Sequence, residues 1–291
     1  MKKVNLFIVG AMKSGTTSLH NYLNIHPEIF MCEPKEPGYF AEEIAWNKGL
    51  EWYMSLFKDA TEQHKYIGES STYYTKLPDH QGVVEKIYDH NPDAKFIYVM
   101  RNPFTRIVSH YWHEYRQHYA GGVQNNILQE CKSKDNYIHY SDYAMQLRPY
   151  INKFGKDRIY LLTFEGLINN PIHETKKIFE WLGLEMDAEL VWSDTDNKYN
   201  ANPKVIYGIK KKMKFMNAIR YSKSWDSLSK LFPKSLRSFM SNSVTTKTSV
   251  EEQQRETELL RQEIKPEIDR IIDNISNLTG TDYAKVWNNS K

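Results

Sequence analysis

Features that mark secreted, metal-binding or membrane proteins are scarce in this sequence of 291 residues. Its two cysteines, Cys32 and Cys131, form neither a metal-ligating nor a redox spacing and provide no disulfide framework. The apolar run that follows the charged start ends at Gly10 after about six residues, too few for a secretion signal or a membrane span. We therefore expect a cytoplasmic protein that has no transmembrane segment.

A strong excess of one charge is also missing. The chain carries 39 Lys and Arg against 36 Asp and Glu, a formal net charge of +3. DNA-binding domains concentrate more basic charge than this, so nucleic acid is not an expected partner, whereas a local pocket for a small anion remains compatible. The length suffices for a sizeable core, and neither an internal repeat nor a low-complexity linker divides it. We expect one domain over 1–291; the oligomeric state is left open.

Alternation of strands and helices is the main organising pattern. Apolar, β-branched or aromatic runs predict buried strands, and amphipathic segments between them predict helices. This order is typical of an α/β fold with a P-loop-like, mostly parallel sheet and helices on both faces. The predicted strands are 4–9, 66–70, 95–101 and 158–164, and the predicted helices are 16–25, 82–90, 104–118, 143–154 and 171–182.

Three further segments lack this clear alternation. Residues 31–62 are irregular and rich in aromatic side chains, and we interpret them as an active-site wall. Residues 190–247 form a lysine-rich region, interpreted as a lid or acceptor region, in which 202–225 has apolar residues at helical spacing. A solvated face, a lid over a cofactor, a landing surface for an acidic glycan and a membrane-surface helix all remain open. A C-terminal helical segment is expected over 249–287.

The stretch FIVGAMKSGTTS, residues 7–18, leads from a strand through a glycine turn into a helix. Gly10 and Gly15 have the G-x-x-x-x-G spacing of a phosphate-binding loop, but the lysine sits inside the loop, at Lys13, instead of after it. Such a turn directs backbone N–H groups and the positive end of a helix dipole at an anion. An ordinary capped helix is the alternative. The first helical turn adds hydroxyl donors from Thr16, Thr17 and Ser18.

A second anion-binding pattern follows the strand 95–101. A nucleoside-triphosphate enzyme needs a carboxylate for magnesium at such a position, but the strand ends in Arg101, which repels a metal and attracts an anion. Arg106 and Ser109 then share one helix face, and arginine with a hydroxyl suits a phosphate group. A surface helix with salt-bridging arginines is the alternative. Two anion sites on adjacent strand ends favour one ligand with two separated anionic groups, and no metal site is expected.

The segments KSGTTS (13–18) and RNPFTRIVS (101–109) together resemble the sulfotransferases that use 3′-phosphoadenosine-5′-phosphosulfate (PAPS). Further similarity runs through LLTFEGLINNP, IFEWLGL and the C-terminal LTGTDYAKVW. The resemblance implies the sulfotransferase fold, PAPS as the donor and no metal. It places Lys13 at the bridging oxygen between phosphate and sulfuryl group. The donor-binding residues that it implies are Lys13, Ser14, Gly15, Thr16, Thr17, Ser18, Arg101 and Ser109.

CEPKEPGYF, residues 32–40, resembles a segment of the glycan (heparan-type) sulfotransferases whose glutamate serves as base. The resemblance implies that Glu36 takes the acceptor's proton, and an aromatic wall is expected to raise the pKa of this carboxyl group. A surface pair of Glu36 with Lys35 and a histidine base are the alternatives. The candidate acceptor-facing residues are Tyr39, Trp46, Glu69 and Tyr73.

Two positions depart from the glycan pattern: Gly38 stands where a histidine is frequent, and Ser70 where a lysine is frequent. We expect sulfuryl transfer to a hydroxyl group, or an amine, of a carbohydrate or small-molecule acceptor. A secondary metabolite or a lipid headgroup is an alternative acceptor. A P-loop kinase and a noncatalytic lysine-rich module that binds acidic polymers are the alternatives from other classes.

Overall fold

The computed structural model describes residues 2–117, 123–124, 126–185, 207–209, 245–247 and 250–288. The chain divides into two compact units. The first, which we call the sheet unit, comprises Met1–Ile107, Asn136–Tyr199 and Glu267–Lys291, and the second comprises Val108–Asp135 and Asn200–Pro266. The single domain predicted for 1–291 stays a prediction.

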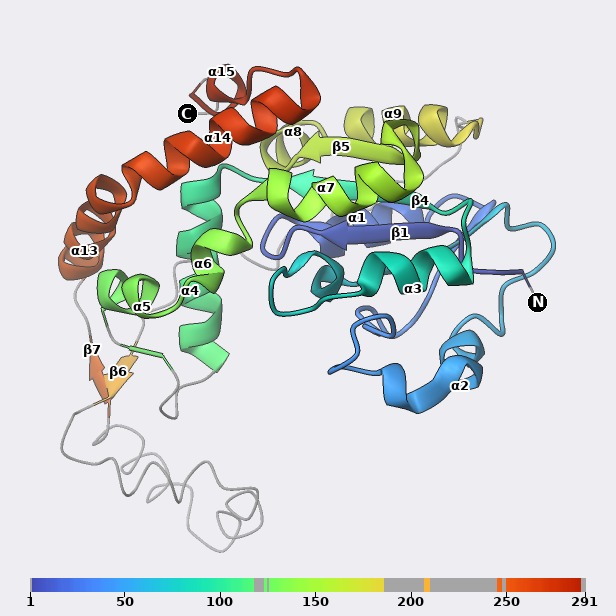
Figure 1. Ribbon diagram of the computed structural model, residues 1–291, viewed down its shortest axis with the longest axis horizontal. Coiled ribbons are helices and arrows are strands. Elements are labelled where there is room, and N and C mark those ends of the chain that lie inside the picture. Colours follow the sequence, from blue (N-terminus) through green and yellow to red (C-terminus); the bar gives the residue numbers. More distant parts are fainter. Residues whose placement is uncertain are drawn as a thin grey trace, which may run out of the picture. The chain divides into compact units, whose positions relative to one another are not determined.

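Five parallel strands form the sheet of the first unit, with β1 in the centre (Figure 1). In the register, Ile8 of β1 is paired with Ser70 on one side and with Ile97 on the other. The strands are mostly apolar because both faces of the sheet are covered. In spatial order the strands are β2 (Ile29–Met31), β3 (Tyr66–Ser70), β1 (Leu6–Gly10), β4 (Lys95–Met100) and β5 (Ile159–Thr163).

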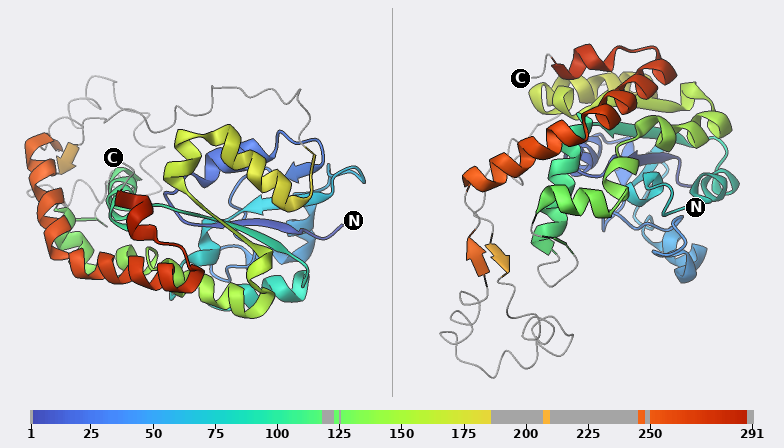
Figure 2. Two further views of the ribbon diagram at one scale, coloured as in Figure 1. Left: turned by 90° about the horizontal axis from the view of Figure 1, so that it is seen from above. Right: turned by 60° about the vertical axis from the view of Figure 1, so that its left-hand side comes forward.

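Helices pack on both faces of this sheet, as Figures 1 and 2 show. Successive side chains of β1 alternate between the faces: Leu6 and Ile8 join one buried cluster, and Phe7 and Val9 join the other. The predicted fold class is therefore confirmed. The first cluster includes residues of α1 (Thr16–Leu23) and α9 (Pro171–Leu182), and the second includes residues of α3 (Val83–His90), α7 (Tyr143–Phe154), α14 (Lys265–Thr279) and α15 (Tyr283–Asn288).

Further helices complete the two units. Within the segment predicted to be irregular, 31–62, the structure has the helix α2 (Gly49–Ser55), so that prediction was wrong in part. The remaining elements are η1 (Trp46–Lys48), η2 (Thr72–Thr75), α4 (Pro103–Gln117), α5 (Ile127–Ser133), α6 (Asn136–His139), η3 (Lys156–Arg158), α8 (Phe164–Asn169) and α13 (Val250–Glu263).

The C-terminal helical segment predicted for 249–287 is present, but as separate helices. The first break falls at Ile264, between α13 and α14. Pro266 explains it, because proline has no N–H to donate to the preceding turn and its ring is tolerated in the first turn of a new helix.

The lysine-rich region predicted over 190–247 lies outside the described residues, apart from two short strands. These are β6 (Tyr207–Ile209) and β7 (Thr245–Lys247), which pair antiparallel. The lid and acceptor roles predicted for this region stay predictions.

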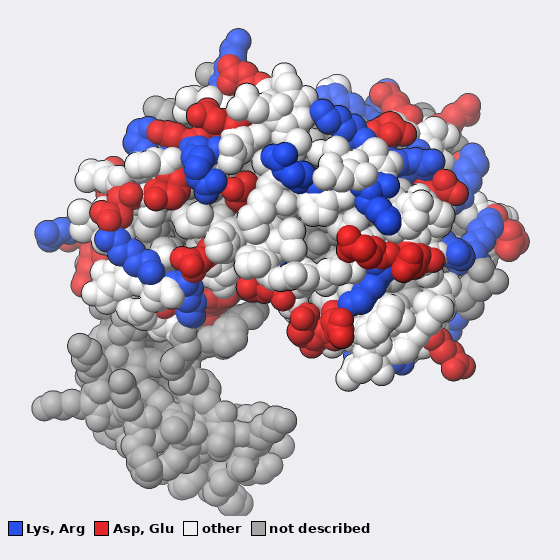
Figure 3. All heavy atoms as spheres, in the orientation of Figure 1, with Lys and Arg blue, Asp and Glu red and all other residues white. Residues whose placement is uncertain are grey.

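The charged side chains of the described residues form no large single-sign field on the face drawn in Figure 3, where basic and acidic groups are interspersed. This matches the nearly even charge count of the sequence. None of the described helices combines the length and the apolarity needed to cross a bilayer.

Gly10 ends β1 at a place where a side chain does not fit. A Cβ added there would collide with Thr75 Oγ1 and lie 2.5 Å from Tyr98 Cε2. We predict that Gly10→Ala lowers the free energy of unfolding by about 1–3 kcal/mol, measured by urea denaturation, because the neighbours must shift. Gly183→Asn, where a Cβ meets nothing within 4 Å and φ is 70°, is the control and should cost less. Equal losses in both variants would contradict the prediction.

Candidate functional site

The carboxyl ends of parallel strands meet at one edge of the sheet, and predicted site residues lie at four of them. Lys13 comes after β1, Glu36 after β2 and Arg101 after β4, and Glu69 is the last but one residue of β3. The connection after β1 leads to β2 on one side of the sheet, and the connection after β4 leads to β5 on the other, so the chain order reverses between the neighbouring strands β1 and β4. Ligands of open α/β sheets bind at such a switch point.

The loop after β1 forms the expected turn into α1. Gly15 caps the helix with φ 82° and ψ 19°, a left-handed conformation that glycine adopts without strain. The Ser14 side chain is fully buried, and within the described part of the chain its Oγ has no hydrogen-bond partner. A buried hydroxyl group without a partner requires an explanation, and a bound anion supplies one. Thr16 is buried, Thr17 exposed and Ser18 half-buried.

Arg101 is directly joined to this loop. Its Nη1 donates a hydrogen bond to the Lys13 carbonyl oxygen at 3.1 Å, and its Nε donates to Thr105 Oγ1 at 3.1 Å. The guanidinium also lies 4.6 Å from the centre of the Phe164 ring. The structure thus brings together Lys13 and Arg101, the two cationic residues predicted to contact the donor.

Arg106 has a different role from the one predicted. It is fully buried, its Nε donates to Ser141 Oγ at 2.6 Å and its Nη2 to the Tyr137 carbonyl oxygen at 2.7 Å. These bonds tie α4 to α6 and the turn after it, so this arginine stabilises the fold. Ser109 lies further along α4 in the second unit, whereas Arg101 belongs to the sheet unit. The predicted pairing of Ser109 with Arg101 at one phosphate therefore stays a prediction.

Glu36 is held by a cation, a hydroxyl group and the backbone. Lys35 Nζ donates to its Oε1 at 2.7 Å, Thr72 Oγ1 donates to its Oε2 at 3.0 Å, and its own N–H donates to the Ser70 carbonyl oxygen at 3.0 Å. Burial raises the pKa of Glu36, but the charges of Lys35 and Lys76 and the hydrogen bonds outweigh burial, so the pKa lies below its ordinary value. The expected upward shift was therefore wrong, and the pair with Lys35, named above as an alternative to the role of base, is present and partly buried.

Backbone strain marks the same two residues that the sequence predicts to be catalytic. Among the described residues, Lys13 with φ 68° and Glu36 with φ 62° are the two non-glycine residues with positive φ. Such conformations cost on the order of 1 kcal/mol or more and cluster at functional sites. This observation is independent of motif spacing.

Glu69 lies within a cluster of hydroxyl groups. It is fully buried, and its carboxylate accepts hydrogen bonds from Tyr53 and Tyr74 at 2.8 Å each and from Ser71 at 2.6 Å. The side chain has no exposed surface in this structure, which favours a structural role, and the predicted acceptor contact stays a prediction. Burial raises the pKa of Glu69 to about 7, although the three hydroxyl donors act in the opposite direction.

The other three candidate acceptor residues differ in exposure. Tyr39 is buried and stacks on Tyr53, with ring centres 4.6 Å apart, whereas Trp46 is 38 % exposed and lies 5.0 Å from the Tyr39 ring. Tyr73 is half-buried, and Lys76 Nζ lies 4.3 Å above its ring. Burial and the nearby charge of Glu36 raise the pKa of Tyr73. Trp46 and Tyr73 thus keep surface for an acceptor, while Tyr39 is part of the core.

His20 adds a contact that no motif predicts. Its Nδ1 lies 2.8 Å from Ser70 Oγ, so helix α1 of the donor loop is joined to the end of β3. Burial and the charge of Lys35 lower the pKa of His20 to about 4, and the ring is neutral at pH 7. Ser70 stands where a lysine is frequent in the glycan pattern, so that positive charge is missing at this position. Lys35 and Lys76 bring positive charge to the neighbouring Glu36.

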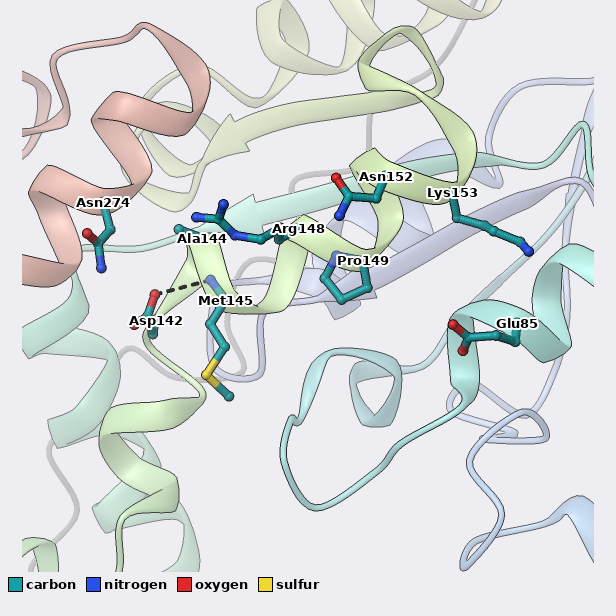
Figure 4. A pocket seen from close by; sticks show the side chains of 9 residues that line it. All are labelled: Glu85, Asp142, Ala144, Met145, Arg148, Pro149, Asn152, Lys153 and Asn274. Atoms are coloured by element: carbon teal, nitrogen blue, oxygen red, sulfur yellow. Dashed lines mark hydrogen bonds between the residues drawn. The ribbon is translucent and has the colours of Figure 1, made fainter.

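A separate pocket lies away from these residues, among α3, α7 and α14 (Figure 4). It includes none of the predicted site residues and carries charges of both signs. One of its acids, Asp142, caps α7 by accepting a hydrogen bond from the Met145 N–H at 3.2 Å. In the described part of the chain, no three His, Cys, Asp or Glu side chains gather as ligands for a metal ion.

The fold and the site define an α/β protein that presents a phosphate-type loop, an adjoining arginine and a nearby carboxylate at one sheet edge. The sequence profile of the family described as "Sulfotransferase domain" matches residues 3–249. The chain therefore belongs to this family, and the predicted assignment to the sulfotransferases is confirmed.

Individual relatives agree with this assignment. The membrane-associated sulfotransferase kil1 of Dictyostelium discoideum is 37% identical over 109 residues, 37% of this chain and 22% of that protein. Human heparan sulfate glucosamine 3-O-sulfotransferase 5 is 25% identical over 190 residues, 61% of this chain and 52% of that protein. The chain thus spans about half the length of the second relative and less than a quarter of the first.

The structure of a sulfotransferase from Alicyclobacillus acidocaldarius superimposes with a TM-score of 0.53 and 27% sequence identity. The match covers 65% of this chain and 89% of that one.

The raised pKa of Glu69 should make the stability of the protein depend on pH. This pKa is about 7 in the folded protein against 4.5 for the ordinary value, so the folded state keeps a proton that the unfolded state has lost. Stability from this group is fully present below pH 4.5 and is lost as the pH rises to about 7, by up to about 1.4 kcal/mol per pH unit. We predict that wild type loses more stability than Glu69→Gln between pH 5 and pH 8 in urea denaturation. An equal change in both proteins would rule this out.

Proposed function

We propose that this chain transfers a sulfuryl group from PAPS to a hydroxyl group of a carbohydrate or small-molecule acceptor. The observation that carries the proposal is the joined pair of Lys13 and Arg101 beside the buried, unpartnered hydroxyl of Ser14. Membership of the sulfotransferase family supports the reaction class. The matches cover only part of each curated relative, so the donor, the acceptor and the catalytic residues all belong to this proposal.

The donor-side residues fit an anionic nucleotide. Ser14, Gly15 and Thr16 would hold the 5′-phosphate at the start of α1, where N–H groups and the helix dipole favour negative charge. Thr17 and Ser18 follow in the same helical turn. The donor would supply the sulfuryl group, and its leaving group is a bisphosphate that needs compensating positive charge.

Lys13 and Arg101 have distinct tasks in this mechanism. Lys13 would donate to the oxygen that bridges phosphorus and sulfur, and so stabilise the charge that develops there as the bridging bond breaks. Arg101 fixes the Lys13 backbone through its carbonyl oxygen, while its remaining N–H groups would bind the 3′-phosphate together with Ser109. Prearranged donors of this kind need no reorganisation during the reaction.

Glu36 would accept the proton of the acceptor hydroxyl as the new oxygen–sulfur bond forms. Its lowered pKa keeps it ionised at neutral pH, which is the form that a base requires. Lys35 and Thr72 occupy one oxygen each in the absence of an acceptor, so the hydroxyl would take up a second lone pair of the carboxylate. Transfer to an amine would use the same residues. A histidine base stays an alternative.

The acceptor would lie against Tyr73, which is close enough to Glu36 to feel its charge, and against the exposed ring of Trp46. An aromatic wall beside a base suits the apolar face of a sugar ring. A secondary metabolite or a lipid headgroup is the second candidate, because Gly38 and Ser70 depart from the glycan pattern. The cytoplasmic location predicted from the sequence stays a prediction.

The donor site can be tested by binding alone. We predict that 3′-phosphoadenosine-5′-phosphate binds the purified protein with micromolar affinity in calorimetry without metal, and that ATP with magnesium binds more weakly. The two nucleotides share adenosine and differ in the 3′-phosphate, in the length of the 5′-phosphate chain and in the metal. Preference for magnesium ATP would favour a P-loop kinase. Tight polyanion binding without either nucleotide would favour a noncatalytic module.

Two substitutions separate donor binding from proton transfer. Lys13→Ala should lower kcat by about a hundredfold or more and weaken bisphosphate binding, because it removes a charge at the leaving group. Glu36→Gln should leave bisphosphate binding within about twofold while lowering kcat by about a hundredfold. Transfer is measured with labelled PAPS over a panel of hydroxyl acceptors. The exposed neighbour Glu33→Gln is the control for Glu36. Undiminished transfer by Glu36→Gln would place the base elsewhere.

A further inference from the structure

The loop that carries Glu36 is hydrogen-bonded to two hydroxyl groups of the segment that follows β3. The Gly38 N–H donates to Ser71 Oγ at 2.9 Å, and the Phe40 N–H donates to the Tyr74 hydroxyl at 3.3 Å. Both hydroxyl groups are buried. An amide N–H can only donate, so each hydroxyl oxygen acts as the acceptor in these bonds.

Each of the two hydroxyl groups must then direct its own proton elsewhere, and both direct it to Glu69. Ser71 Oγ donates to Glu69 Oε2 at 2.6 Å, and the Tyr74 hydroxyl donates to Oε1 at 2.8 Å. At pH 8 Glu69 is ionised, and because a carboxylate only accepts, it fixes the direction of both bonds. The result is a pair of relays from a buried carboxylate, through a hydroxyl group, to a backbone amide of the loop.

Tyr53 binds Glu69 in the same way but has no hydroxyl link to the loop amides that the structure describes. Its hydroxyl donates to the same Glu69 Oε1 at the same distance, 2.8 Å, but among the described residues it accepts no hydrogen bond from the loop amides of Gly38 and Phe40, which donate to Ser71 and Tyr74. Its ring stacks on Tyr39 and meets Phe40 edge-on, contacts that survive loss of the hydroxyl. Tyr53 and Tyr74 therefore form a matched pair that differs in the link to the loop.

We propose that Glu69 is a positioning residue for the transfer reaction, orienting the Ser71 and Tyr74 hydroxyl groups so that they hold the Glu36 loop in its reactive conformation. This inference rests on the proposed role of Glu36 as base. Glu36 has φ 62°, so its backbone needs outside support to persist in this conformation. The same partner segment also binds Glu36 itself, through the Ser70 carbonyl oxygen and Thr72 Oγ1.

The position of Glu69 in the sheet explains how it would affect the transfer reaction. Glu69 lies in β3, where it is paired with Phe7 of β1, the strand that leads into the donor loop. The carboxylate thus ties the loop of the base to the strand next to the donor loop. A shift of about 1 Å between reacting groups is enough to lower a rate about a hundredfold.

The test compares Tyr74→Phe with Tyr53→Phe at pH 8. Both variants remove one hydroxyl donor from Glu69 Oε1, and only Tyr74→Phe also removes the acceptor of the Phe40 amide. We expect Tyr74→Phe to lower kcat between about tenfold and a hundredfold, with KM for PAPS and bisphosphate affinity within about twofold. Tyr53→Phe should stay within about threefold of wild type in kcat. Ser71→Ala, which cuts the other relay, should resemble Tyr74→Phe and serves if that variant folds poorly.

Hydrogen exchange provides a readout that does not depend on activity. The backbone amides of Gly38 and Phe40 should exchange faster in Tyr74→Phe and Ser71→Ala than in wild type. In Tyr53→Phe their exchange rates should equal those of wild type. Equal effects of the two tyrosine variants on exchange and on kcat would overturn the proposal, because Glu69 would then act only through general stability. Faster exchange with unaltered kcat in a chain that does transfer sulfuryl groups would also overturn it. If the wild type neither binds the bisphosphate nor transfers, the exchange comparison still decides whether the relays exist, and the proposed function alone fails.

Discussion

Parallel pairing of β1 with β3 and β4 is the constraint on which the rest of the site depends. Parallel strands bring their carboxyl ends to one edge, so segments far apart in sequence arrive beside each other without further instruction. The Arg101–Lys13 hydrogen bond joins the ends of β4 and β1, and the Glu36 N–H bond to Ser70 joins the chain after β2 to the end of β3. Covering both faces of the sheet with helices then buries this edge's polar groups, which must find partners.

Buried polar groups divide the site into two halves with opposite requirements. On the donor side, Ser14 Oγ is buried with no partner among the described residues, as expected of a surface that completes its hydrogen bonds with a ligand. On the base side, Glu69 is fully satisfied by three hydroxyl groups inside the protein. In the function we propose, the first half would receive an anion, and the second would position the loop that carries Glu36. Rigid support and open binding are both needed when catalysis depends on positioning.

Local patterns were enough to predict much of the fold and the donor loop. Strand 66–70 and helices 143–154 and 171–182 have the predicted bounds, because apolar periodicity and punctuating glycine and proline residues act over a few positions. Lys13 and Arg101 could be predicted from spacing and from the rule that neighbouring strand ends converge. The three-residue strand β2 was missed, since so short a run has no period to detect.

Charge and burial at the base side could not be predicted in the same way. The sequence shows Glu36 among aromatic residues, which favours a raised pKa, but the charge and hydrogen bond of Lys35, with smaller contributions from Thr72 and Lys76, lower the pKa instead. Arg106 matches a phosphate-binding pattern, yet tertiary packing directs it to Ser141 and Tyr137. Glu69 sits in a strand end whose orientation is decided by the β1–β3 register, and a polar residue's burial is not visible in its neighbours along the chain.

The strained backbones of Lys13 and Glu36 follow from the same geometry. Glycine would adopt both conformations at lower cost, and the chain does use glycine at Gly15 and Gly38, each two residues further along. At Lys13 and Glu36 the backbone must turn tightly and also present a charged side chain, so relief of strain by glycine would remove the group itself. The surrounding bonds, from Arg101 to the Lys13 carbonyl oxygen and from the Glu36 N–H to Ser70, hold those turns in place. Strain therefore persists in this chain where a side chain at a tight turn is required by the chemistry we propose.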